Sequence, residues 1–254
     1  MKRILVLLLL AVGVLVVIGR QTLSSAATAP DTKLPPITRP ADDGTDAQSP
    51  EQLAQFLQGV INDVNDSWAT EFQKAGREYT PAGLQLYYGG GVNSACGATD
   101  GSVGPFYCPA DQTVYLGLDF MQGLDQNLGA PGDFAKAYVV AHEVGHHVQN
   151  LLGITDSVDQ RDSRSSVAVE LQADCLAGVW GNSANKRGLI ENGDLDEGLN
   201  AAASVGDDVL MRQAGQTVNP DSFTHGSAEE RASWLLRGYN TGNSDSCDTF
   251  SAAA

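Results

Sequence analysis

Basic residues are scarce in this chain. Its 254 residues include 15 Lys and Arg but 31 Asp and Glu, which gives a formal net charge of −16 at pH 7. A nucleic-acid partner would require a basic patch or stripe, so this composition argues against one. The charge bears on solubility and partners and does not identify a substrate. No internal repeat is visible in the sequence.

The N-terminus has the pattern of a targeting segment. Lys2 and Arg3 precede an apolar run over residues 4–18 that only Gly13 interrupts. This length fits both a signal peptide and a membrane anchor, so we expect residues 1–29 to be one or the other. Because the basic residues precede the apolar run, we expect the rest of the chain on the extracytoplasmic side, either secreted or held at the membrane by this single segment.

Large apolar side chains are nearly absent from residues 30–48, which are rich in Pro, Asp and Thr. Such a stretch cannot bury enough surface to offset the entropy of ordering, so it is expected to be a flexible linker. The folded domain is then expected at residues 49–254, which is long enough for one domain with its own core.

Cysteine is rare as well. There are four, and none belongs to a C-x-x-C pair, which argues against a four-cysteine zinc knuckle. Cys96 and Cys108 lie close together in a glycine-rich stretch, which favours a disulfide in an exported chain. Cys175 and Cys247 would then pair by elimination, although four cysteines allow three connectivities.

Hydrophobic periodicity predicts an α+β fold that is mostly helical, with a small β-sheet. Ser49-Pro50-Glu51-Gln52 is typical of a helix start, and apolar residues recur at spacings of three and four up to Phe72. Short apolar runs at residues 84–88 and 113–118 predict strands. Further helices are predicted at residues 132–152, 165–180, 195–211 and 228–239.

Three of the four histidines lie within six positions. In His142-Glu143-Val144-Gly145-His146, the outer histidines are four residues apart, hence about 40° apart around a helix axis. Both can reach one metal ion from the same face, and Glu143 can act as general base on a metal-bound water. A helix whose histidines only cap or pack is the alternative.

Two other residues of this motif have different expected roles. His147 points about 100° away from His146, so we expect a packed or hydrogen-bonded structural histidine. Glycine inside a helix costs about 1 kcal/mol relative to alanine. The presence of Gly145 therefore suggests close approach by a neighbouring backbone, such as the next predicted helix.

A catalytic zinc usually has three protein ligands and one open position. Gln149 and Leu152 stand where a metzincin would have a glycine and a third histidine, which excludes that pattern. Glu170 and Asp174 share a helix face, so Glu170 can be the third ligand. Asp174 can then accept the outer ring N–H of a ligating histidine. A solvated acidic helix face is the alternative.

The segment from His142 to His147, followed by Glu170-x-x-x-Asp174-Cys175, resembles the bacterial neutral zinc metallopeptidases, a group within the gluzincins. Cys96 with Cys108, the predicted strand at residues 113–118, and Ser222-Phe223-Thr224-His225-Gly226 are also similar to that family. The resemblance covers about residues 50–250.

This resemblance implies a minimal gluzincin-like domain at residues 49–254 that binds one Zn²⁺. It implies an endopeptidase that hydrolyses peptide or protein substrates through a zinc-bound water activated by Glu143, with His142, His146 and Glu170 as ligands. The alternative function is a non-catalytic, metal-stabilised and membrane-tethered module that binds peptides or regulates a partner. Membrane contact would arise only from an uncleaved N-terminal segment.

His225 is the remaining histidine. In gluzincins a distal histidine donates a hydrogen bond to the oxyanion of the tetrahedral intermediate, and the resemblance implies this catalytic role for His225. The alternatives are a third ligand in place of Glu170, or a helix-capping or surface histidine. Arg231 would orient His225 or a nearby carboxylate, or else lie exposed on a helix.

The predicted strand at residues 113–118 has a further interpretation. If it lies at a sheet edge, an extended peptide could add to it as another strand. Ordinary pairing within the sheet is an equally good account of the same residues.

Overall fold

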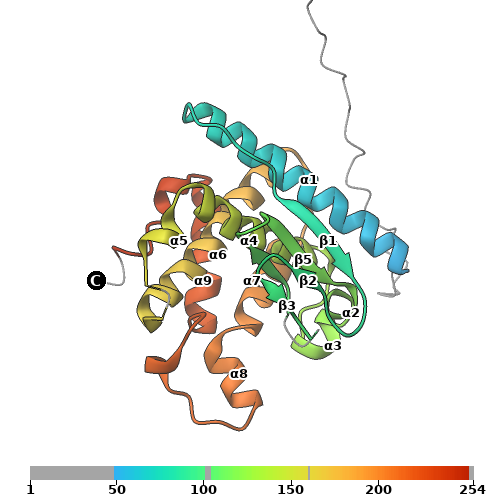
Figure 1. Ribbon diagram of the computed structural model, residues 1–254, viewed down its shortest axis with the longest axis vertical. Helices are drawn as coiled ribbons and strands as arrows, with labels where there is room; N and C mark the ends of the chain where they lie inside the picture. The colour runs from blue at the N-terminus through green and yellow to red at the C-terminus, as the bar shows by residue number, and fades with distance from the viewer. Residues whose placement is uncertain (1–48, 101–103, 160, 252–254) are drawn as a thin grey trace, which may run out of the picture. The chain divides into compact units, whose positions relative to one another are not determined.

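The computed structural model describes residues 49–100, 104–159 and 161–251 (Figure 1). The predicted N-terminal segment at residues 1–29 and the linker at residues 30–48 lie outside these described residues. Within the described part, no helix has the length and apolar character needed to span a membrane.

The first element is the long helix α1 (Pro50–Lys74). Its start is a capping box: the backbone N–H of Gln52 donates to the Ser49 hydroxyl, and the Gln52 side chain accepts from the Ser49 backbone N–H. This arrangement satisfies two amides that would otherwise lack partners at the helix start. The apolar stripe predicted from the sequence is buried, and α1 packs against α4 (Asp133–Leu151) and α2 (Leu118–Gln122).

A small mixed sheet lies beside these helices. Its order is β1 (Gly83–Tyr87), β5 (Thr113–Gly117), β4 (Phe106–Cys108), with β1 parallel and β4 antiparallel to β5. The strand considered as a possible edge is therefore central, and the edge interpretation of it is wrong. Both of its neighbours, β1 and β4, are edge strands of the described sheet, and the three residues of β4 pair with Val114 and its two neighbours on β5. A separate antiparallel pair is formed by β2 (Asn93–Ser94) and β3 (Gly97–Ala98).

The remaining helices confirm a mostly helical α+β domain. After the sheet come α3 (Leu124–Leu128), α4, α5 (Ile154–Ser157), α6 (Ser163–Lys186), α7 (Asp194–Ser204), α8 (Asp207–Gln213) and α9 (Ala228–Thr241). Two short 3₁₀ turns, η1 (Pro220–Ser222) and η2 (Ser244–Ser246), flank α9 in the chain. Helix α4 is central to the packing and contacts α1, α6, α7, β4 and β5.

The single helix predicted at residues 195–211 is wrong. Helix α7 ends at Ser204, and α8 begins at Asp207 after Gly206, whose backbone is extended. Gly206 lies so close to the start of α9 that a Cβ there would collide with the backbone nitrogen of Ala228. The Asp207 backbone N–H then donates to the Gly226 carbonyl at 2.8 Å. A long-range contact, which periodicity does not report, ends the helix.

Two disulfides fasten the domain. Cys96 pairs with Cys108 and ties the loop after β2 to strand β4. Cys175 pairs with Cys247 and ties α6 to the C-terminal tail. These are the connectivities favoured by the sequence.

Helices α6 and α9 approach each other closely. A Cβ on Gly238 would collide with the Cys175 carbonyl, and one on Gly178 with the Leu235 carbonyl. Glycine on both helices therefore permits backbone contact between them. This contact brings the N-terminal part of α9, which carries Arg231, next to the middle of α6, which carries Asp174.

Candidate metal centre

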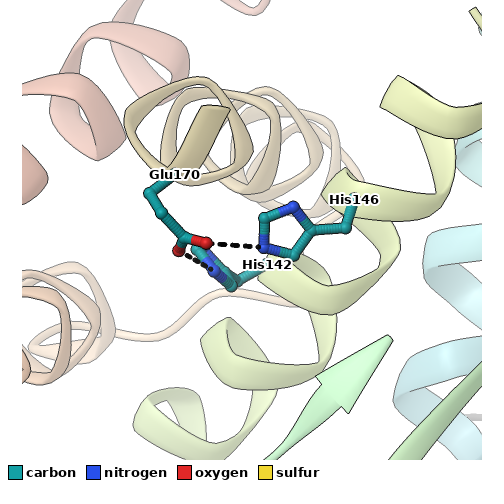
Figure 2. Close-up of side chains that lie close together, drawn as sticks. All are labelled: His142, His146 and Glu170. Carbon is teal, nitrogen blue, oxygen red and sulfur yellow. Dashed lines mark ion pairs between the residues drawn. The ribbon is translucent and has the colours of Figure 1, made fainter. Parts of the chain in front are cut away.

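Three predicted ligands converge in the structure. His142 and His146 lie on α4 and Glu170 lies on α6, and one donor atom from each falls within 4.8 Å of the others. The Nε2 atom of His142 is 3.2 Å from Glu170 Oε2, and Nε2 of His146 is 3.4 Å from Glu170 Oε1. Figure 2 shows both rings turned toward the same carboxylate. His225 is not part of this cluster.

Outer contacts determine which ring nitrogen faces the centre. Asp174 Oδ1 lies 2.8 Å from His142 Nδ1, and Gln149 Oε1 lies 2.9 Å from His146 Nδ1. Gln149 must present its oxygen to His146, because its amide nitrogen donates to the Val169 carbonyl at 2.7 Å. Both Nδ1 atoms therefore carry hydrogen, which leaves each Nε2 lone pair directed at the centre.

This donor set fits a divalent cation such as zinc. With both Nε2 atoms deprotonated, the two imidazoles and the carboxylate present three converging acceptors, and a cation between them would satisfy all three. Two histidines and one glutamate are also a known ligand set for catalytic zinc, in which a fourth position stays open. His142, His146 and Glu170 are the residues that would hold the ion.

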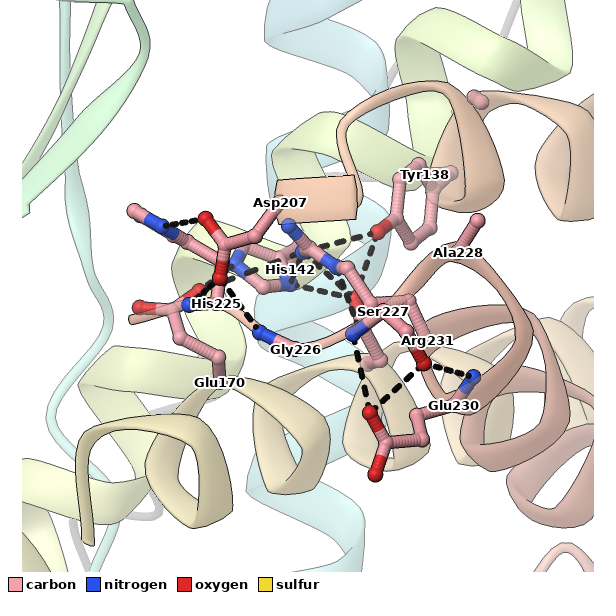
Figure 3. Close-up of polar contacts among 12 residues, drawn as sticks. Tyr138, His142, Glu170, Asp207, His225, Gly226, Ser227, Ala228, Glu230 and Arg231 are labelled. Carbon is pink, nitrogen blue, oxygen red and sulfur yellow. Dashed lines mark hydrogen bonds and ion pairs between the residues drawn. The ribbon is translucent and has the colours of Figure 1, made fainter. Parts of the chain in front are cut away.

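Asp174 is the buried hub behind the ligands. It is fully buried, and its Oδ1 accepts from the Tyr138 hydroxyl at 2.5 Å as well as from His142. The Arg231 guanidinium donates to both carboxylate oxygens, from Nε at 2.9 Å and from Nη2 at 3.0 Å. Figure 3 shows Arg231 and Tyr138 meeting beside His142. Arg231 is only 4% exposed, so the alternative of an exposed arginine is wrong and the alternative of an orienting contact to a carboxylate is correct.

Electrostatics in this cluster favour a charged Asp174 and Glu170. Burial alone would raise the pKa of Asp174, but Arg231 and His142 outweigh burial and lower that pKa. Burial alone would lower the pKa of His142. The charge of Asp174, the hydrogen bond to Asp174 and the hydrogen bond to Glu170 outweigh burial and raise this pKa to about 10. The site therefore attracts positive charge, which a bound metal ion would supply in place of protons.

Glu143 follows the first ligand on α4 and faces a cavity of about 610 Å³. It is 7% exposed, and burial raises its pKa, which makes its carboxylate a stronger base. The cavity is also lined by the three ligands, by His225, and by apolar residues of the β4 segment and of the stretch from α7 to α8: Pro105, Phe106, Ala201, Val205 and Leu210.

His225 reaches this cavity from the loop before α9. Asp207 holds that loop: one carboxylate oxygen accepts from the backbone N–H groups of Thr224, His225 and Gly226 at 2.7, 2.7 and 3.0 Å (Figure 3). The His225 side chain is half exposed, and its Nδ1 lies 2.8 Å from the Thr224 hydroxyl. The N-cap of α9 is Ser227, so His225 does not cap that helix.

His147 is a buried structural histidine, as its direction on the helix predicts. Its side chain is inaccessible to solvent, and its Nε2 lies 2.6 Å from the Thr80 carbonyl. Its Nδ1 lies 2.9 Å from the Tyr107 hydroxyl. His147 thereby joins α4 both to the segment before β1 and to strand β4.

Sequence reasoning missed several residues that support this site. Tyr138 stands four residues before His142, so the same helical spacing that paired the histidines could have found it. In the sequence, Gln149 is evidence only against a metzincin, because its contact with His146 has no local signature. Asp207 has none either, because its role depends on the chain folding back so that the His225 loop reaches α8.

Comparisons with known proteins show relatives of this chain in bacteria. The chain is 44% identical over 223 residues to the uncharacterized protein YpfJ of Escherichia coli K12, covering 85% of this chain and 77% of that protein. It is 45% identical over 189 residues to the uncharacterized protein Rv2575 of Mycobacterium tuberculosis, covering 69% of this chain and 64% of that protein. No solved structure matches the chain.

The family described as "Putative neutral zinc metallopeptidase" matches residues 2–250. This match spans the described domain together with its candidate metal ligands, and the family name suggests zinc dependence and peptidase activity at the level of the family. The chain therefore belongs to the neutral zinc metallopeptidase family.

Proposed function

We propose that this protein is a zinc-dependent endopeptidase that hydrolyses peptide bonds on the extracytoplasmic side. One observation carries the proposal: His142, His146 and Glu170 converge at the wall of a cavity that Glu143 also lines. A purely structural zinc site usually has four protein ligands and does not need a general base. Three ligands beside a buried carboxylate are instead the arrangement of a hydrolytic site.

When bound, zinc would supply Lewis-acid chemistry, lowering the pKa of a water molecule to about 7 and polarising the substrate carbonyl. Glu143 would take the proton from the attacking water and return it to the leaving amine. His225 would donate a hydrogen bond to the oxyanion, from a loop that Asp207 holds through three backbone amides. Asp174 and Gln149 would keep the histidine rings in their ligating orientation.

The edge strand β4 supports an extended peptide as substrate. Phe106 and Tyr107 of β4 line the cavity, and within the described part of the chain β4 pairs only with β5. A peptide adding to the outer edge of β4 would be held through its backbone, away from its ends. Such binding favours cleavage inside a chain.

The two disulfides support the proposed location, because disulfides form and persist mainly in oxidising compartments outside the cytoplasm. Attachment to the membrane through residues 1–29 is part of the proposal only if that segment is not cleaved.

The test joins metal analysis to a peptide-library assay. Purified protein loaded with zinc should contain one zinc per chain and cleave members of the library, and a chelator should abolish cleavage. The matched variant Glu143→Gln should keep its zinc and lose about 10²- to 10⁴-fold in kcat, the usual contribution of a general base.

Two outcomes would overturn the proposal. Zinc-loaded protein that cleaves no peptide in a chelator-sensitive way would favour the non-catalytic, peptide-binding alternative. Unchanged turnover in Glu143→Gln would remove this residue from the mechanism.

A further inference from the structure

We propose that Asn150 of α4 binds the backbone of the peptide substrate through a side-chain amide that Tyr107 and His147 hold in one orientation. This inference rests on the proposed function, and it assigns a substrate contact to a residue outside the metal-binding motif. Four features carry it: the place of Asn150 on α4, the hydrogen bonds that orient it, the part of the amide left free, and its closeness to strand β4.

Asn150 lies on the ligand face of α4. It follows His146 by four residues and His142 by eight, so the three side chains are stacked along one side of the helix. The side chain is half-buried and lines the same cavity as both ligands and Glu143. It therefore lies one helical turn, about 5.4 Å along the helix axis, beyond His146, and one to two residues of an extended peptide span a similar length.

A chain of hydrogen bonds fixes the orientation of this amide. It begins at the Thr80 carbonyl, which can only accept, so the hydrogen of His147 is on Nε2, 2.6 Å away. Nδ1 of His147 must then accept, and the Tyr107 hydroxyl donates to it at 2.9 Å. The Tyr107 oxygen in turn accepts from Nδ2 of Asn150 at 3.0 Å. Each step leaves one possibility for the next, so Nδ2 of Asn150 points to Tyr107.

The rest of the Asn150 amide is available. Its Oδ1 atom and its second Nδ2 hydrogen have no hydrogen-bond partner among the described residues. Trp68 Nε1 is the only buried side-chain nitrogen or oxygen without a partner in that part of the chain, so Oδ1 of Asn150 is accessible to solvent, and Asn150 is one of the residues that line the cavity. An oriented and uncharged acceptor is therefore accessible on a residue that lines the metal-centre cavity, and the second Nδ2 hydrogen of the same amide has no partner among the described residues.

The chemistry of this group matches a peptide backbone. A carboxamide offers one acceptor and one donor side by side, which is what the N–H and C=O groups of an extended chain require. Such a contact is independent of the substrate's side chains. Because Tyr107 belongs to β4, the same hydrogen bond also couples Asn150 to the edge strand on which we expect the peptide to lie.

The competing explanation is that Asn150 only anchors Tyr107 and thus stabilises β4. The two explanations differ in what happens to the substrate. If Asn150 contacts a backbone group, removing that group from the peptide and removing the Asn150 side chain eliminate the same hydrogen bond, so the second change should add little loss of activity to the first. If Asn150 only anchors β4, the two changes should act independently.

The experiment uses the octapeptide that zinc-loaded protein cleaves fastest in the library, or binds most tightly if none is cleaved, with each backbone amide N-methylated in turn. We expect Asn150→Ala to keep one zinc per chain and to lower kcat/KM by about five- to tenfold, the usual worth of one hydrogen bond. One N-methylated peptide should show a similar loss with the wild-type protein and little further loss with Asn150→Ala. Tyr107→Phe, which removes the anchor but keeps the amide, should show a smaller loss.

A second measurement does not depend on turnover. In a Glu143→Gln background, Asn150→Ala should weaken binding of the same fluorescein-labelled octapeptide by about five- to tenfold. If N-methylation at every position lowers kcat/KM or peptide binding by the same factor in the protein with Asn150 and in the Asn150→Ala variant, the inference is wrong and Asn150 is only an anchor. Cleavage that does not depend on Asn150 would refute this inference alone. Binding that depends on Asn150 without any cleavage would refute the proposed function alone. Neither binding nor cleavage would refute both.

Discussion

Gly145 of α4 lies directly against the backbone of Ala173 of α6. A Cβ on Gly145 would be 3.0 Å from the Ala173 carbonyl oxygen and 3.1 Å from its Cα. This close approach confirms the expectation that a glycine beside the metal motif admits a neighbouring backbone. It also explains the reach of Glu170, which is one turn before Ala173 and must extend to both histidines. The separation of α4 and α6 therefore sets the size of the metal centre.

Gly145→Ala should weaken zinc binding more than it weakens the fold. The alanine methyl gains about 1 kcal/mol of helix propensity, which offsets part of the steric cost. The contact is with backbone, however, so the two helices must separate, and metal sites tolerate displacements of only about 0.5 Å. We expect zinc affinity to fall by about tenfold or more, measured by competition with a chromogenic chelator. A variant with unchanged zinc affinity would show that the helix spacing does not control the site.

Glu170→Ala should lower the zinc content, and His225→Ala should not. Glu170 is the acidic member of the three-residue cluster, whereas His225 lines the same cavity from the loop before α9 and is not part of the cluster. The loss of affinity should exceed the about 10- to 100-fold typical of removing an outer partner of a ligand. Zinc per chain after dialysis against a weak chelator is the measurement. A full equivalent of zinc in Glu170→Ala, with zinc lost in His225→Ala, would identify His225 as the third ligand.

Asp174→Asn should destabilise the domain far more than Tyr138→Phe, although both residues touch His142 or its partner. Removing the Asp174 charge leaves the buried Arg231 guanidinium with Glu170, 4.0 Å from its Nη2, as its remaining anionic neighbour. Breaking a buried ion pair in this way costs about 3–5 kcal/mol. Tyr138→Phe removes two hydrogen bonds, one donated to Asp174 at 2.5 Å and a longer one accepted from Arg231 at 3.3 Å, together worth about 1–2 kcal/mol, and leaves the ion pair intact. Denaturant unfolding of the zinc-free proteins measures both values. Equal losses would mean that Arg231 finds another partner.

The parts of the site that the sequence predicts are those set within one helix. His142 and His146 are placed together by the helical repeat alone, and the same repeat puts Glu170 and Asp174 on one face of α6. These faces of α4 and α6 form one site once the two helices pack against each other, and Gly145 is the residue in the sequence that indicates this close packing. Periodicity and caps likewise predict a mostly helical α+β domain.

The parts that the sequence does not predict depend on contacts between distant segments. Arg231 could be assigned to Asp174 only after Gly178 and Gly238 bring α6 and α9 into backbone contact. The break at Gly206 depends on the start of α9. The central position of β5 depends on strand order, because an apolar run has the same pattern whether it has one neighbouring strand or two.

The Cys175–Cys247 disulfide should matter to the zinc site as well as to the fold. The Cys247 carbonyl accepts from Gln172 Nε2 at 2.9 Å, Gln172 Oε1 accepts from Gln149 Nε2 at 3.1 Å, and Gln149 Oε1 accepts from His146 Nδ1 at 2.9 Å. This series of hydrogen bonds runs from the tail to a ligand. The Cys96–Cys108 disulfide joins the turn between β2 and β3 to the end of β4, and it has no such connection among the described residues.

The two double variants Cys175→Ala/Cys247→Ala and Cys96→Ala/Cys108→Ala form a matched pair. Their loops span 72 and 12 residues, so loop-closure entropy predicts losses of about 4 and about 3 kcal/mol in the free energy of unfolding. Stability alone separates the two variants only slightly.

Zinc affinity should separate the two variants clearly. Freeing the tail loosens Gln172 and Gln149, and losing an outer contact to a ligating histidine lowers zinc affinity by about 10- to 100-fold. We therefore expect weaker zinc binding in the first variant and nearly unchanged binding in the second. Equal zinc affinities would show that Gln149 holds His146 without help from the tail.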